Sequence, residues 1–177
     1  DRSYSATPTE DLQLKGEIEN GEAKITLPEF DRTDFFTHVV GYTWGFTSDP
    51  EGKKIQYYGG KTYSFKEDTK LYRVLVKYGG GSGTKEDPYI INYYDQLELI
   101  GEEKARGYFK QTEDLEFPEY ASHTPIDTIN ELKSDPDSEI FMYDGGNFKI
   151  KNLTSPLFGQ VSGAVIKNVN ISDSHIS

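Results

Sequence analysis

The chain of 177 residues contains no cysteine, which excludes disulfide bonds and thiolate metal sites. Small secreted eukaryotic domains usually carry disulfides, whereas bacterial surface proteins and cytosolic proteins often do without them. No apolar run approaches the roughly 18 residues that a membrane-spanning helix requires. Basic residues are also few, since 19 Lys and Arg face 30 Asp and Glu and give a formal net charge of -11. A charge of this sign opposes binding to nucleic acid and to anionic membranes.

Aromatic side chains, in contrast, are abundant. They make up 14% of the chain, with 13 Tyr and 10 Phe. This content argues against disorder and favours β-rich structure. The length suits one large or two small domains. The chain starts at Asp1 without Met, so we expect that it was cut from a longer polypeptide and that residues 1–10 are a leader or a linker.

A short repeat near the C-terminus is the strongest signal of architecture. The sequence IKNLT at 150–154 recurs as IKNVN at 166–170. A repeat of this length buries an apolar face only by stacking on a copy of itself, which predicts a parallel β-helix. Ile166 is out of phase with the aliphatic residues that follow it, so we expect a bend near Lys167 and Asn168. We also expect further repeats of the same polypeptide after the last residue. The alternative is two ordinary strands that share three residues by chance.

The first half has the pattern of a small antiparallel β domain. Asn20-Gly21 is a strong signal for a two-residue hairpin and predicts strands near 12–18 and 23–27. Further strands are expected at 39–46, 55–58, 63–65 and 71–77. The last of these carries apolar residues on both faces, so we expect it to be central in its sheet.

A glycine-rich stretch separates the two halves. We expect residues 79–86 to form a linker. A phosphate-binding loop is not indicated, because no Gly-Lys-Ser/Thr closes the stretch and no helix opens directly after it. Residues 87–91 then predict a short buried strand.

A single helix is expected directly after that strand. Residues 93–103 place Leu97 and Ile100 on one face. Asn92 fits an N-cap with Asp95 as its partner. A β-helix needs a cap over its first coil, and we expect this helix to be that cap.

Short motifs in the first half carry a resemblance to a known module. They are ITLP at 25–28, GYT at 41–43, GFTSDPEG at 45–52, GKTY at 60–63 and DTKLY at 68–72. In this order they resemble the Listeria–Bacteroides repeat, the family that includes the B repeats of internalins. The resemblance implies a small β-grasp-like fold on a bacterial surface protein. Where that family has Gly-Trp, this chain has Gly45-Phe46 with Trp44 before the glycine, which leaves the strand register open at this point.

The second half resembles another family over residues 81–177. The motifs are GSGT at 81–84, DPY at 87–89, TPI at 124–126, DGG at 144–146, IKNL at 150–153 and LFG at 157–159. They occur in the order seen at the start of GLUG-motif β-helices. Such repeats are found in bacterial adhesin-like surface proteins and in the non-catalytic N-terminal part of immunoglobulin A1 metalloproteases. The resemblance implies a right-handed parallel β-helix.

No arrangement of residues points to catalysis. His38, His123 and His175 lie in three separate segments, and no His-Glu-x-x-His zinc motif is present. The sequence GQVSG at 159–163 places its serine one position too late for a nucleophile elbow. We therefore assign no catalytic residue, no cofactor and no metal site.

Two carboxylate clusters would offer oxygen ligands to Ca²⁺. One is formed by Asp135, Asp137 and Glu139, and the other by Asp49 and Glu51. Neither has the spacing of an EF-hand loop, so we interpret both as solvated loops.

Two asparagines lie in N-glycosylation sequons. They are Asn152 and Asn170. We interpret them as coil positions whose side chains satisfy turn or ladder hydrogen bonds.

The sequence thus predicts a mainly β chain, with a small β-grasp-like domain at 11–78 and the start of a right-handed parallel β-helix with an N-terminal capping helix at 87–177. We expect a non-catalytic module of a bacterial cell-surface or secreted protein, located outside the cell and acting in adhesion or as a structural spacer. The alternative is an accessory region of a secreted immunoglobulin A1-type zinc metalloprotease. A polysaccharide-active enzyme is disfavoured, because no cluster of carboxylates and basic residues can be assigned. The expected partner is a host protein or a glycan, contacted by exposed Tyr and Phe, with no nucleic acid and no membrane insertion.

Overall fold

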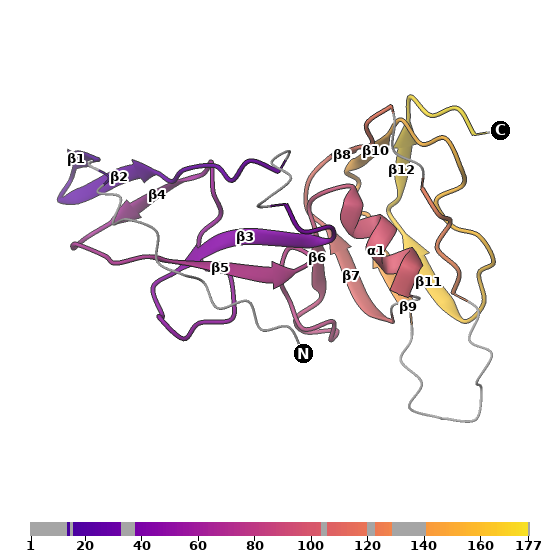
Figure 1. Cartoon of the computed structure of the whole chain (residues 1–177), viewed down its shortest axis with the longest axis horizontal. Coiled ribbons are helices and arrows are strands. Elements are labelled where there is room, and N and C mark those ends of the chain that lie inside the picture. The colour runs from indigo at the N-terminus through magenta and orange to yellow at the C-terminus, as the bar shows by residue number, and fades with distance from the viewer. Residues whose placement is uncertain are drawn as a thin grey trace. The chain divides into compact units, whose positions relative to one another are not determined.

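A computed structural model describes residues 14, 16–32, 38–103, 106–119, 123–128 and 141–176. The protein is mainly β, with twelve strands and one short helix in these ranges. It divides into two compact units, Asp1–Lys77 and Tyr78–Ser177, and each is described by itself (Figure 1). No helix in the described ranges is long and apolar enough to cross a membrane.

Unit 1 contains two antiparallel sheets. Their strands are β1 (Glu17–Glu19), β2 (Glu22–Thr26), β3 (Tyr42–Thr47), β4 (Thr62–Phe65) and β5 (Tyr72–Lys77). One sheet has the order β1-β2-β4, and the other pairs β3 with β5. The turn between β1 and β2 places both Asn20 and Gly21 at positive φ, which only a few residue types tolerate. The hairpin predicted from this pair of residues is confirmed.

The prediction that the strand at 71–77 is central in its sheet is wrong. In the described part of the chain, β5 pairs with β3 alone. Val74 lies opposite Gly45, where Ile55 packs so closely that a Cβ on the glycine would meet it at 2.6 Å. Leu75 lies opposite Trp44 on the other face. Apolar residues on both faces therefore reflect packing on two sides of a strand, not strand neighbours on two edges.

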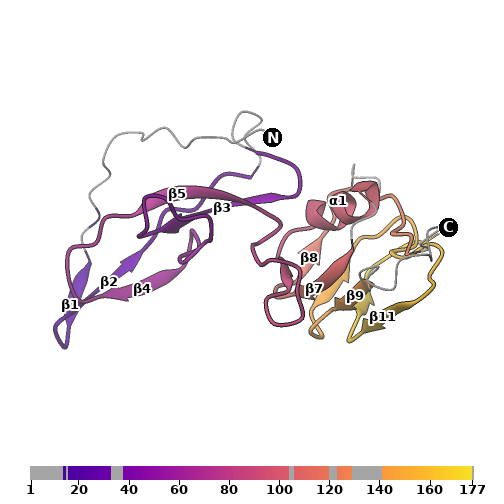
Figure 2. The ribbon, with the colours of Figure 1, turned by 90° about the horizontal axis from the view of Figure 1, so that it is seen from below.

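Unit 2 is built from parallel strands. They are β6 (Tyr89–Ile91), β7 (Gly107–Gln111), β8 (Leu115–Glu116), β9 (Phe141–Asp144), β10 (Lys149–Lys151), β11 (Ala164–Lys167) and β12 (Asn170–Ser172). One sheet has the order β11-β9-β7-β6, and the other has the order β12-β10-β8. A third line of pairing is a parallel bridge between Ile126 and Phe158. The chain visits these lines in the same order on each pass, and β7, β9 and β11 lie side by side (Figure 2).

Residues in register form columns through unit 2. Leu115, Ile150 and Ile171 occupy matching positions on β8, β10 and β12. The first two are fully buried, whereas Ile171 on the last strand is 42% exposed. A column of this kind brings like side chains together and removes their apolar surface from water, which is the main favourable term in folding.

The two copies of the IKN repeat do not stack on each other, and that expectation is wrong. Ile150 pairs with Leu115 and Ile171, whereas Ile166 pairs with Tyr143 in the other parallel sheet. Each copy instead ends a strand with an asparagine in the left-handed region, with φ of 61° at the first copy and 54° at the second. Asparagine tolerates this conformation better than most residues. The repeat therefore marks two different corners, one after β10 and one after β11, and the bend expected at 167–168 is confirmed.

Close packing of backbones at one corner supports a first prediction. A Cβ on Gly145 would lie 2.5 Å from the carbonyl oxygen of Asn168. We expect Gly145→Ala to lower the free energy of unfolding of unit 2 by about 2 kcal/mol, because backbone on the neighbouring coil must move. Gly163→Ala, which meets nothing within 4 Å and adopts a φ of 66°, should cost about 1 kcal/mol through strain alone. Denaturant unfolding of both variants tests the order, and an equal cost would contradict it.

The helix α1 (Asp95–Glu103) buries the face that the sequence predicts, with Leu97 and Ile100 both inaccessible to solvent. The side chain that reaches back to the backbone N–H of Asn92 is that of Gln96, one residue beyond the Asp95 that the sequence predicts as its partner. The Gln96 side chain accepts hydrogen bonds from the backbone N–H groups of Asn92 and Tyr93, at 2.8 and 3.1 Å. It also donates one to the Asn92 side chain at 3.0 Å. This arrangement satisfies N–H groups at the start of the helix.

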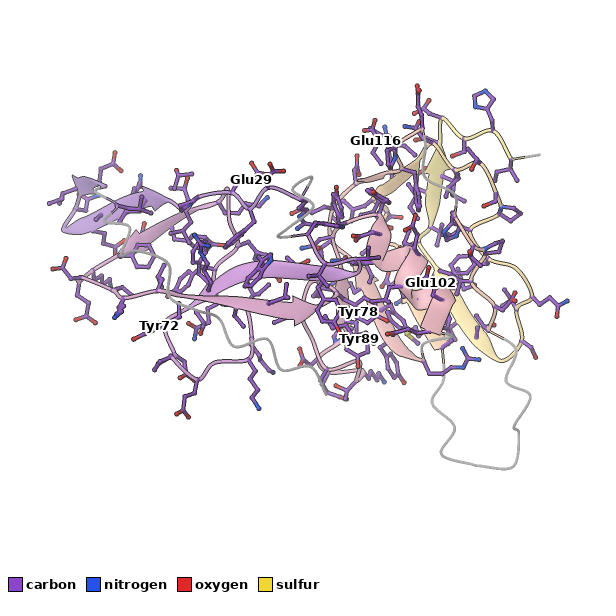
Figure 3. The ribbon with its side chains drawn as sticks, in the orientation of Figure 1. Glu29, Tyr72, Tyr78, Tyr89, Glu102 and Glu116 are labelled. Carbon is purple, nitrogen blue, oxygen red and sulfur yellow. The ribbon has the colours of Figure 1, made fainter. Side chains whose placement is uncertain are left out.

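The segment 79–86, for which composition suggests a linker, is tied to β6 by backbone hydrogen bonds. Gly79 donates to the carbonyl of Ile90 at 2.7 Å, and Ile90 donates to that of Gly80 at 2.9 Å. Tyr78 is buried, and its ring centroid lies 4.9 Å from that of Tyr89. Both side chains are labelled in Figure 3. The described backbone of this segment thus packs as part of unit 2.

Candidate functional site

The three histidines lie in different surroundings. His38 is a half-buried residue of unit 1, and His175 is an exposed residue of unit 2. His123 is buried, with its Nε2 atom 3.1 Å from the carbonyl oxygen of Leu157. Burial lowers the pKa of His123, so the ring stays neutral at neutral pH. Its ring also packs edge-on against Phe117, with centroids 5.4 Å apart, so His123 contributes to the packing of unit 2.

The carboxylates singled out from the sequence do not gather into a metal site in the described part of the chain. Asp135, Asp137 and Glu139 lie outside the described residues. The Asp49 side chain accepts a hydrogen bond from the N–H of Glu51 at 2.9 Å, as a turn residue does. Across the described ranges, no group of three His, Asp or Glu side chains is placed to hold a metal ion.

The sequon asparagines differ in their contacts. The Asn152 side chain donates a hydrogen bond to the carbonyl oxygen of Phe117 at 3.2 Å, which links one coil to its neighbour. This is the ladder role expected from the sequence. Asn170 is exposed on β12.

An acidic cluster on α1 perturbs one carboxyl group. Burial, followed by the charges of Asp95 and Glu102, raises the pKa of Glu98 from the ordinary 4.5 to about 7. Glu98 therefore holds a proton over part of the neutral range. Repulsion among these three carboxylates, which lie on successive turns, lowers the stability of the helix.

This cluster gives a prediction on pH dependence. The pKa of Glu98 is higher in the folded than in the unfolded chain. Unit 2 therefore has its full stability below about pH 4.5, where Glu98 is protonated in both states, and loses part of it as the pH rises through 7 and Glu98 ionises. We expect the melting temperature of unit 2 to fall between pH 5.5 and pH 8, and Glu98→Gln to reduce that fall. Glu103→Gln removes the same charge at the exposed end of α1 and serves as the control. An unchanged pH dependence in Glu98→Gln would contradict the assignment.

A half-buried aromatic surface is the feature of unit 1 that the sequence reasoning missed. Along β3, Thr43, Gly45 and Thr47 are buried, whereas the larger residues between them are only half-buried. Trp44 and Phe46 share one side of the strand with their cross-strand partners Leu75 and Arg73. We call the set Phe30, Trp44, Phe46 and Arg73 the aromatic face.

The geometry of the aromatic face is compact. The ring of Phe30 lies over β3, with centroids 6.1 Å from Trp44 and 4.9 Å from Phe46. The Phe30 and Trp44 rings are inclined by only 26°. The guanidinium carbon of Arg73 lies 5.8 Å from the Phe30 centroid, in the range of a cation–π interaction. Flat rings beside an exposed cation can bind a ligand that has an apolar side and a negative group.

Comparison with known proteins identifies no relative. No family model, no curated protein and no solved structure matches the chain. The function proposed below is therefore argued from the chain's own residues and geometry.

Proposed function

We propose that the chain is a non-catalytic module of a bacterial cell-surface or secreted protein and that it acts in adhesion or as a structural spacer. The observation that carries this proposal is the set of in-register columns in unit 2. Parallel strands that repeat along one axis extend a structure by adding coils, which suits a spacer. The inward-facing side chains of these columns, such as Leu115, Ile150, Phe109 and Tyr143, are apolar and buried, so they serve packing.

We assign unit 2 to the first coils of a right-handed parallel β-helix and unit 1 to a β-grasp-like module. Three lines of parallel pairing support the first assignment, because a β-helix has one short strand on each side of a coil. The position of α1 supports a capping role. Tyr94, just before α1, packs on Phe117, with ring centroids 5.3 Å apart. Gly101 within α1 lies against the carbonyl of Thr124. The helix thus covers the segments that follow β8.

Adhesion and spacing differ in what they require of the surface. A spacer needs only a stable stack, whereas an adhesive module needs residues that contact a host protein or a glycan. The aromatic face supplies side chains of the kinds that dominate binding surfaces, Trp and Arg among them. It is the observation that favours an adhesive contribution from unit 1.

Surface display tests this function. We expect a non-adherent bacterium that displays the full chain on a membrane anchor to bind host epithelial cells more than one that displays the anchor alone. Hydrogen exchange of the same chain should show slow exchange of the backbone N–H groups of β7, β9 and β10. Equal adherence would contradict the adhesive role, and rapid exchange throughout unit 2 would contradict the spacer role.

A further inference from the structure

The two sides of β3 reverse the usual pattern of burial. In most half-buried strands the large apolar residues face the core and the small polar ones face water. Here the buried side carries Thr43 and Thr47, each 2% exposed, and the other side carries Trp44 and Phe46, which are only half-buried. A cluster of large apolar side chains that keeps part of its surface in contact with water is informative, because folding alone gains nothing from that exposed part.

Charge distinguishes this surface from the rest of the molecule. Unit 1 has 13 acidic and 11 basic residues, whereas unit 2 has 17 and 8, so most of the negative charge belongs to unit 2. Residues 28–77, which include Phe30, β3 and β5, hold 7 acidic and 8 basic residues. On the side of the aromatic face, β5 places Arg73 opposite Phe46 and Lys77 opposite Tyr42. The local charge is therefore close to neutral in an acidic chain, and the exposed Arg73 supplies a cation for an anionic ligand on this side.

We propose that the aromatic face binds a carboxylated sugar residue of a host glycan. A pyranose ring presents several C–H groups on one flat side, and these are attracted to the negative face of an aromatic ring such as Trp44. The carboxylate would accept hydrogen bonds from the guanidinium of Arg73, whose planar fork matches carboxylate geometry. This proposal rests on the adhesive role proposed above and names the class of ligand for it.

An acidic peptide fits the observations less well. Recognition of an extended peptide uses main-chain hydrogen bonds at a sheet edge and pockets for alternate side chains. The aromatic face lies on the broad side of the β3–β5 pair and offers stacked, nearly parallel rings beside one cation. Flat, ring-shaped ligands with a negative group match it better.

Titration of the full chain with defined sugars tests the proposal. The probes are 3′-sialyllactose, its uncharged counterpart lactose, and a peptide of eight glutamates. We expect binding of sialyllactose and about tenfold or more weaker binding of lactose, as for the loss of a charge-assisted hydrogen bond. Arg73→Gln should weaken sialyllactose binding to the level of lactose, and Trp44→Leu should weaken both sugars.

Lys70→Gln is the matched control. Lys70 also lies over an aromatic ring of unit 1, 5.4 Å from the Tyr72 centroid, but Tyr72 faces the side of β5 that carries Val74. This variant should bind sialyllactose as the unmodified chain does. Circular dichroism of each variant confirms that unit 1 is folded. Equal affinity for lactose, preference for the peptide, no binding of sialyllactose, or unchanged binding in Arg73→Gln would each overturn the proposal.

The display experiment separates failure of this site from failure of the adhesive function. If cells displaying Arg73→Gln adhere as well as cells displaying the unmodified chain, adhesion stands and the carboxylated-sugar site is wrong. If the unmodified chain gives no adherence, the adhesive function itself is wrong.

Discussion

Replacing Ile150 with alanine should lower the free energy of unfolding of unit 2 by about 3 kcal/mol. Ile150 is fully buried on β10, between Leu115 on one neighbouring strand and Ile171 on the other. Truncation removes apolar contacts on both sides and leaves a cavity that fixed backbones cannot close. Hydrogen exchange of the N–H groups of β10 during denaturant titration measures the loss.

Ile171→Ala is the control within the same column. Ile171 occupies the matching position on β12 but is 42% exposed, so the same truncation should cost about 1 kcal/mol or less. Trp44 is the single tryptophan and belongs to unit 1, so its fluorescence midpoint should not change in either variant. An equal cost for the two isoleucines would contradict the order of burial along the column.

Gln111→Leu should destabilise unit 2 by a similar amount, about 3 kcal/mol, because one buried amide satisfies three polar groups. The Gln111 side chain is fully buried. Its amide nitrogen donates to the carbonyl oxygens of Glu113 at 2.9 Å and Lys149 at 3.1 Å. Its amide oxygen accepts a hydrogen bond from the hydroxyl of Tyr143 at 2.9 Å. Leucine would leave the buried hydroxyl of Tyr143 and the two part-buried carbonyl groups without these partners.

A double-mutant cycle with Tyr143 makes this second prediction specific. Tyr143→Phe removes one hydrogen bond from the network and should cost about 1–2 kcal/mol. The double variant should cost less than the sum of the single variants, because the phenylalanine ring has no hydroxyl that the loss of the Gln111 amide could leave unpaired. Denaturant unfolding of the four chains gives the coupling energy. Additive costs would show that the two side chains act independently, contrary to the contact described here.

The sequence predicts best what depends on neighbouring residues alone. The hairpin at Asn20-Gly21 follows from two residue types that accept positive φ, so no distant contact is needed to anticipate it. The buried face of α1 follows from the spacing of Leu97 and Ile100. The strand-rich secondary structure likewise agrees with the high content of aromatic residues.

Prediction fails where the deciding partner lies elsewhere in the chain. The IKN repeat specifies a strand that ends at a left-handed asparagine, but it does not specify which line of strands the corner belongs to. The position of β5 in its sheet depends on which edges are paired, and apolar content does not report this.

The aromatic face was missed for a related reason. The alternation of Tyr42, Trp44 and Phe46 with small residues is visible in the sequence. Which side of β3 is buried, however, depends on distant packing, such as that of Ile55 against Gly45.

Interstrand backbone NOEs in the isotopically labelled full chain test the arrangement of unit 2 most directly. We predict amide-to-Hα NOEs that link β10 with both β8 and β12, with Ile150 in register with Leu115 and Ile171. The corresponding backbone NOEs of Ile166 should lead to Tyr143 on β9. NOEs that pair the backbone of Ile150 with that of Ile166, or an antiparallel pattern between these strands, would contradict the stacked parallel coils on which the proposed spacer role depends.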